Sequence, residues 1–107
     1  MFRLYILLCS KKKSSKAKII FDILKNTKVV DKKITESAPR YGIDKISKVD
    51  LSILRLAVYE LTIEKREPPK VIINEAIELA KELAGEKSPA FINAVLGKVY
   101  KQLTAEN

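Results

Sequence analysis

The most constraining feature of this sequence is a series of apolar residues at helical spacing from Val49 to Leu103. Residues that recur every three or four positions form one face of an amphipathic α-helix. The breaks in the series are Pro68-Pro69, Gly85 and Ser88-Pro89, and proline is tolerated in the first turn of a helix but not in its interior. Short loops between helices favour antiparallel or steeply crossed neighbours. The pattern therefore predicts an all-α fold, a compact helical bundle.

An earlier stretch, with apolar residues from Ile19 to Ile34, has the same period and extends the bundle towards the N-terminus. Pro39 and Gly42 are expected to end this first helix, since proline disfavours helical geometry in the residue before it. A short turn near residues 43–49 leads into the next helix, which is apolar around most of its circumference and should lie at the centre of the core. The expected helices are 16–37, 50–65, 71–83 and 89–103.

Four residues are predicted to form the ends of these helices. Ser15 and Ser88 are plausible N-caps, and Asp50 either caps the second helix or interacts with its N-terminal dipole. Gly85 is suited to a left-handed C-terminal cap. Arg55 lies within the apolar central helix, and we expect it to pair with a carboxylate of the following helix, Glu75 or Glu78, because buried charges are kept when paired.

Several classes of function are excluded by the residue types. The chain has no histidine and one cysteine, Cys9, which leaves no intramolecular disulfide, no Cys/His metal set and no histidine base. Helical glutamates accompanied by lysine and arginine are typical of solvated faces. The apolar opening, residues 1–9, is far shorter than the ~20 residues that span a bilayer. We therefore predict no enzyme, no cofactor, no metal and no membrane span, in a protein of the reducing cytoplasm.

Positive charge is concentrated in the first half of the chain. Residues 1–48 contain 13 Lys or Arg against 4 Asp or Glu, a net +9, whereas residues 49–107 contain 8 against 9, a net −1. Such asymmetry favours a polyanionic partner, because binding phosphates releases counterions; a solvated lysine-rich surface is the alternative. The densest cluster, a candidate RNA-binding patch, is Lys11, Lys12, Lys13, Lys16 and Lys18.

Aromatic residues are the second element expected of an RNA-binding surface. Unpaired bases stack on aromatic side chains, and Tyr41, Phe91 and Tyr100 are candidates for this role. Aromatic residues at helical spacing also commonly fill cores. Both interpretations of Phe91 and Tyr100 are open from the sequence.

Three segments resemble the NusB transcription antitermination family: FDILKNTKVVDKKI, VDLSILRLAVYEL and PPKVIINEAIELAKELAGEKSPAFINAVLGKV. The resemblance covers residues 19–103. It implies an RNA-binding factor that pairs with NusE, a ribosomal small-subunit protein, on single-stranded boxA RNA. The pair helps RNA polymerase read through terminators, notably in ribosomal RNA operons. By the same resemblance, Asp50 faces NusE, while Phe91 and the basic Lys98 contact RNA.

The start of the chain departs from the family pattern. Residues 1–18 stand where the family has an arginine-rich segment and two helices, so the resemblance implies an incomplete N-terminal bundle: a separate segment 1–15 and a helical domain 16–107. The gap would be filled by the opening MFRLYILLC, by a homodimer, or by further residues of a longer protein. Lysine lacks the planar fork of arginine. The alternative function is therefore a module that binds NusE without sequence-specific RNA binding.

Overall fold

A computed structural model describes residues 23–37, 45–65 and 67–105, and all of its elements are helical. They are α3 (Thr27–Ser37), α4 (Lys48–Tyr59), the π-helix η2 (Glu60–Glu64), α5 (Pro69–Leu83) and α6 (Ser88–Ala105). The predicted all-α class is confirmed. The N-terminal segment and the predicted gap in the bundle lie outside the described residues. Among the described helices, none has both the length and the apolar character needed to cross a bilayer.

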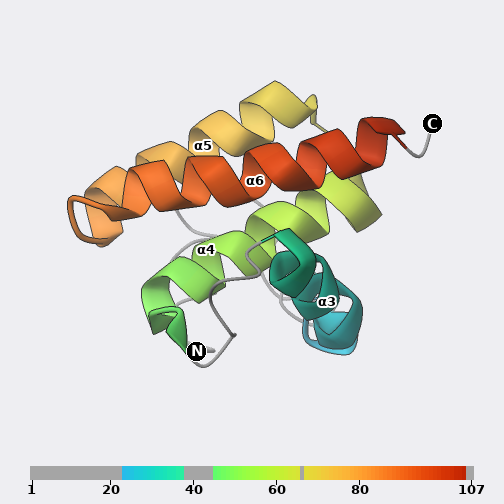
Figure 1. The fold of residues 1–107 in the computed structure, drawn as a ribbon, viewed down its shortest axis with the longest axis horizontal. Coiled ribbons are helices and arrows are strands. Elements are labelled where there is room, and N and C mark those ends of the chain that lie inside the picture. The colour runs from blue at the N-terminus through green and yellow to red at the C-terminus, as the bar shows by residue number, and fades with distance from the viewer. Residues whose placement is uncertain (1–22, 38–44, 66, 106–107) are drawn as a thin grey trace.

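Helices α5 and α6 lie side by side and antiparallel, joined by the short loop 84–87 (Figure 1). Helix α4 packs against both and runs in the same direction as α6, while α3 crosses α4 and also contacts α6. Because α4 and α6 point the same way, their N-terminal ends lie at the same end of the bundle (Figure 1). This arrangement brings residues near 50 close to residues near 90.

The core is centred on α4, as its apolar sequence predicts. From Leu51 to Tyr59 every residue of this helix except Arg55 is buried. The apolar faces of the other helices pack around α4. The buried residues on these faces recur every three or four positions, as expected for amphipathic helices. Their fully enclosed side chains are Val30 and Ile34 in α3, Ile72, Ala76 and Ala80 in α5, and Ile92, Leu96 and Val99 in α6.

Helix ends differ from the sequence predictions in detail. The N-cap of α4 is Ser47, whose Oγ accepts a hydrogen bond from the backbone N–H of Asp50 at 3.2 Å, so Asp50 lies inside the first turn. No described glycine has a positive φ, so the prediction of a left-handed Gly85 cap is wrong. Helix α5 instead ends at Ala84 in extended geometry. The first helix is interrupted by a turn at Asn26, and its predicted cap, Ser15, lies outside the described residues.

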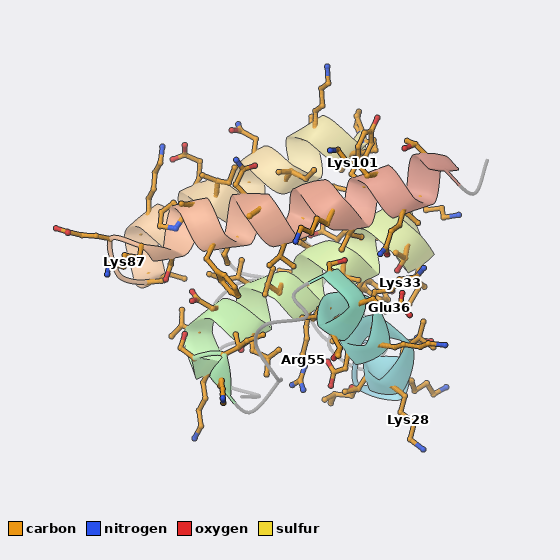
Figure 2. All side chains as sticks on the ribbon, in the orientation of Figure 1. Lys28, Lys33, Glu36, Arg55, Lys87 and Lys101 are labelled. Atoms are coloured by element: carbon orange, nitrogen blue, oxygen red, sulfur yellow. The ribbon has the colours of Figure 1, made fainter. Side chains whose placement is uncertain are left out.

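The ion pair of Arg55 joins α4 to α3 and not to α5. Its Nε and Nη2 donate to the two carboxylate oxygens of Asp31 at 2.8 and 2.9 Å. The expected partner on α5 is therefore wrong: the side chain of Arg55 leaves α4 on the side away from α5 (Figure 2), and Glu78 pairs with Lys81 of its own helix. The period of an apolar helix does not show which neighbouring helix faces its one polar position.

Lys65 ends η2 in the left-handed conformation, with φ of 53°. This geometry costs an L-residue roughly 1–2 kcal/mol and costs glycine almost nothing. We therefore expect Lys65→Gly to raise the free energy of unfolding by about 0.5–1 kcal/mol in urea denaturation, once the added chain entropy of glycine is subtracted. Lys98→Gly, in the exposed middle of α6, is the matched control and should lower it by about 1 kcal/mol. A loss of stability for both variants would contradict this account of Lys65.

Candidate nucleic-acid interface

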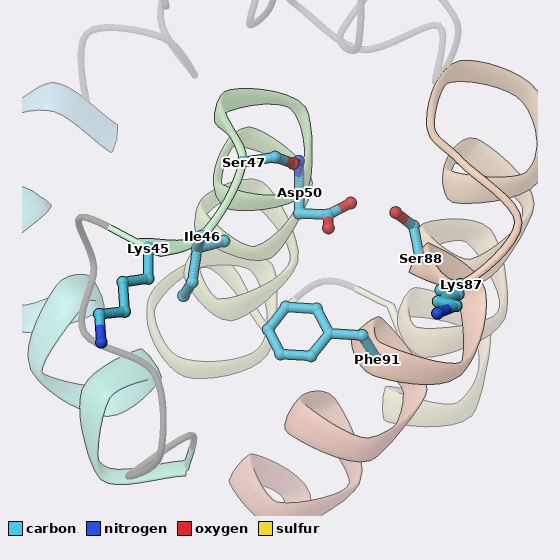
Figure 3. Close-up of a pocket in the computed structure, with 7 residues that line it drawn as sticks. All are labelled: Lys45, Ile46, Ser47, Asp50, Lys87, Ser88 and Phe91. Carbon is cyan, nitrogen blue, oxygen red and sulfur yellow. The ribbon is translucent and has the colours of Figure 1, made fainter.

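A pocket of about 310 Å³ lies where the N-terminal ends of α4 and α6 meet. The turn before α4 and the start of α6 contribute its described lining (Figure 3). It contains both Asp50 and Phe91, residues that the family resemblance assigns to two different partners. Its lining residues are Lys45, Ile46, Ser47, Asp50, Lys87, Ser88 and Phe91.

Phe91 is half-buried and packs against the margin of the core. Its ring extends from α6 towards Ile46 and forms one wall of the pocket (Figure 3). The ring therefore contributes to core packing and is also accessible from the pocket, while its stacking on RNA bases stays a prediction. Tyr100, on the same helix, lines a different pocket together with Leu61, Pro69 and Leu103.

The carboxylate of Asp50 is held in the first turn of α4. A negative charge is favourable at this end of a helix, because the unpaired backbone N–H groups carry partial positive charge. Its Oδ1 is shielded from solvent and accepts no hydrogen bond from the described residues. Figure 3 shows the Asp50 carboxylate and the Ser88 hydroxyl pointing towards one another from the two helices.

Two lysines add positive charge to the pocket. Lys45 and Lys87 are both exposed and contribute to its lining. Together with Asp50, the described lining residues carry a net charge of +1. The first turns of α4 and α6 add further positive potential, so the surroundings of Phe91 attract anions.

The remaining predicted RNA-binding residues fall into two groups. Lys98 is exposed on α6, seven residues after Phe91, and this spacing places the two residues on the same side of the helix. It does not line the pocket. Lys11, Lys12, Lys13, Lys16 and Lys18 all lie outside the described residues.

Besides the predicted Asp50 and Phe91, the structure adds Lys45, Ile46, Ser47, Lys87 and Ser88 to the candidate site. Ser88 was expected only as a cap, while Lys45 and Ser47 had no assigned role. The sequence showed only that polar residues occur near the starts of two helices. Such residues are common there as helix caps and do not by themselves indicate a binding site. Nothing in the sequence shows that the two starts meet, because that depends on the parallel packing of α4 and α6.

Three comparisons bear on the origin of this fold. The model of the NusB family matches residues 6–101. A protein of Clostridium botulinum (strain Loch Maree / Type A3) named transcription antitermination protein NusB is 54% identical over 82 residues, which are 77% of this chain and 58% of that protein. A protein of the same name from Geotalea daltonii is 45% identical over 85 residues, 79% of this chain and 59% of its own length. The chain thus spans less than two thirds of these relatives.

The solved structure of T. maritima NusB has a similar fold, with a TM-score of 0.79 and 27% sequence identity. The match covers 94% of this chain and 85% of that one. Sequence and fold agree, and the segments that carry the resemblance include α4, α5 and the start of α6. This chain belongs to the NusB family.

Proposed function

We propose that this chain is an RNA-binding transcription antitermination factor. In this proposal it acts in the cytoplasm with NusE on single-stranded boxA-type RNA in nascent ribosomal RNA transcripts, and thereby becomes part of the antitermination complex on RNA polymerase. The observation that carries the proposal is the pocket at the α4 and α6 N-termini, whose lining includes the ring of Phe91 together with Lys45 and Lys87. The names of the relatives support the same role.

The chemistry of the pocket supports unpaired RNA as the ligand. Single-stranded RNA is bound by stacking bases on aromatic rings and by placing its phosphates near cations. Phe91 supplies the ring, and Lys45 and Lys87 both contribute to the lining of the same pocket. In Figure 3 the ammonium group of Lys45 points away from the ring. Lys98 adds an exposed cation on α6. Lys11, Lys12, Lys13, Lys16 and Lys18 stay predicted phosphate contacts from the sequence.

NusE is the proposed protein partner, and Asp50 is the residue that the family resemblance assigns to it. That assignment stays a prediction. Because Asp50 and Phe91 line one pocket, a NusE contact at Asp50 would lie directly beside the bound RNA. The proposal therefore places protein and RNA at one end of the bundle.

Fluorescence anisotropy of a labelled boxA-type RNA tests this function directly. The chain is titrated into this RNA and into a scrambled control, with and without NusE, at two salt concentrations. We expect tighter binding of the boxA RNA and a further increase in affinity with NusE. Equal, salt-sensitive binding of both RNAs would show phosphate attraction alone, and with retained NusE binding it would support the alternative module that lacks sequence-specific RNA binding.

Substitution of Phe91 separates stacking from packing. Phe91→Leu keeps an apolar side chain against the core but removes the ring, and we expect it to weaken boxA RNA binding about tenfold, since stacking contributes roughly 1–3 kcal/mol per base. Phe91→Tyr should bind nearly as well as the wild type. Tyr100→Leu makes the same change of residue class on the same helix, outside this pocket, and should leave the affinity unchanged. Equal losses for Phe91→Leu and Tyr100→Leu would contradict a stacking role.

A further inference from the structure

We infer that the outer face of α3, which carries Lys28 and Lys32, binds the phosphates of RNA that extends beyond the boxA element. The ligand is a run of phosphodiester groups, and the contact is independent of base sequence. The inference rests on the proposed RNA-binding function and deepens it, because it adds a second surface, outside the pocket, that holds the same RNA. Neither the predicted lysine cluster at residues 11–18 nor the family resemblance assigns a role to these two lysines.

Lys28 and Lys32 lie one helical turn apart on the exposed side of α3. Lys28 points away from the bundle (Figure 2). In the part of the chain that the structure describes, neither lysine forms an ion pair. Two like charges at this spacing repel each other and weaken a helix modestly. An anion bound across both of them would remove this repulsion.

The acidic residues of α3 do not compensate these two lysines. Asp31 lies between them in the sequence, but its carboxylate oxygens accept hydrogen bonds from Arg55 of α4 at 2.8 and 2.9 Å. Glu36 is exposed in the last turn of the helix, one turn beyond Lys32. The nearest carboxylate is therefore engaged with α4, and positive charge remains on the outer face of α3.

Charge is divided between two groups of the described helices. Helices α3 and α6 together contain five lysines and two acidic residues, a net +3, whereas α5 and η2 contain two lysines and five glutamates, a net −3. Helix α5 has the mixed charges that are typical of a solvated face, including the pair between Glu78 and Lys81. Helices α3 and α5 lie at opposite edges of the bundle (Figure 1), so a polyanion is attracted to the α3 side.

The position of α3 favours RNA over an acidic protein as the occupant of this face. Helix α3 contacts α4 and α6, the two helices whose first turns form the pocket. Lys45, in the lining of that pocket, extends away from the Phe91 ring on the side where α3 lies (Figure 3). An RNA strand longer than the pocket continues over the neighbouring surface, and its phosphates follow positive charge whatever the base sequence.

The test measures the salt dependence of RNA binding by fluorescence anisotropy. The probes are a labelled boxA-type RNA of about ten nucleotides and two longer RNAs, in which an oligouridine tail of similar length extends its 5′ or its 3′ end. We expect the wild-type chain to bind one of the extended RNAs about tenfold more tightly than the short RNA at low salt.

The variant Lys28→Gln/Lys32→Gln should lose this gain in affinity. For the extended RNA, the slope of log Kd against log salt concentration should fall by about 1.4, because each phosphate contact of a single strand contributes about 0.7. The short RNA should bind the variant and the wild type with equal affinity, since it does not reach α3.

Two control variants separate a local contact from general effects of charge. Lys70→Gln/Lys81→Gln removes the same charge from exposed positions on α5 and should leave the gain from the tail unchanged. Lys28→Arg/Lys32→Arg keeps the charge on α3 and should retain the gain, because phosphate attraction requires only a cation. Lysine, arginine and glutamine have similar helix propensities, and helical circular dichroism checks that every variant is folded.

Three results would overturn the inference. If neither tail adds affinity in the wild type, or if the α3 and α5 glutamine variants lose the gain equally, α3 is not a phosphate-binding surface, while binding of the short boxA RNA leaves the proposed function in place. No binding of any RNA would overturn both. Unchanged RNA binding with weaker NusE binding by Lys28→Gln/Lys32→Gln would instead assign the outer face of α3 to a protein partner.

Discussion

Leu54→Ala is expected to lower the free energy of unfolding by about 3 kcal/mol, within the range of roughly 2–5 kcal/mol for buried leucines. Leu54 has no exposed surface and lies in α4, which contacts α3, α5 and α6. Truncation leaves a cavity that three rigid helices cannot readily close. In a domain of about this size the loss corresponds to a melting temperature lower by roughly 15 °C.

The matched control is Leu24→Ala, because the side chain of Leu24 is 48% exposed. This variant loses the same atoms and should change the free energy of unfolding by less than about 0.5 kcal/mol. Urea denaturation followed by circular dichroism measures both. Comparable losses for the two leucines would contradict a core centred on α4.

The ion pair between Asp31 and Arg55 should give a coupling energy of about 2 kcal/mol in a double-mutant cycle. The two side chains are 23% and 14% exposed and form two parallel hydrogen bonds. Because the pair is partly buried, its coupling energy should lie between two limits. Exposed ion pairs contribute at most about 1 kcal/mol, and disrupting a fully buried ion pair costs about 3–5 kcal/mol. The cycle uses Asp31→Ala, Arg55→Ala and the double variant, each measured by urea denaturation.

The pair between Glu78 and Lys81 provides the comparison within the same molecule. Its nitrogen and oxygen are 3.4 Å apart and both side chains are more than half exposed. A cycle at this pair should give a coupling energy below about 0.5 kcal/mol. A coupling of the same size at both pairs would show that Asp31 and Arg55 do not hold α3 against α4.

Most of the fold follows from residue spacing and from a few turn residues. Pro69 lies at the first position of α5, as proline chemistry predicts. Ser88, predicted as the cap residue before the last helix, is instead the first residue of α6. The errors in the predicted helix ends occur where the local sequence allows more than one way to cap the helix. Ser47 and Asp50 are both good N-caps, and nothing local decides between them, while Gly85 permits a left-handed cap without requiring one.

The candidate site was less accessible to sequence reasoning, because it depends on packing between distant segments. Phe91 and Asp50 were identified separately through the family resemblance, and only the common direction of α4 and α6 places them in one pocket. The partner of Arg55 was missed for the same reason. Helical periodicity shows that a residue faces a neighbour, but the crossing of α3 over α4 determines that the neighbour carries Asp31.

Terminator read-through is the measurement that tests the antitermination role most directly. Transcription is reconstituted with RNA polymerase, NusE and this chain on a template that carries boxA ahead of a terminator. The account predicts more full-length transcript when the chain is added, dependent on both NusE and an intact boxA, and a smaller increase with Phe91→Leu. Read-through that is unchanged by the chain, or equally raised on a template with scrambled boxA, would contradict it.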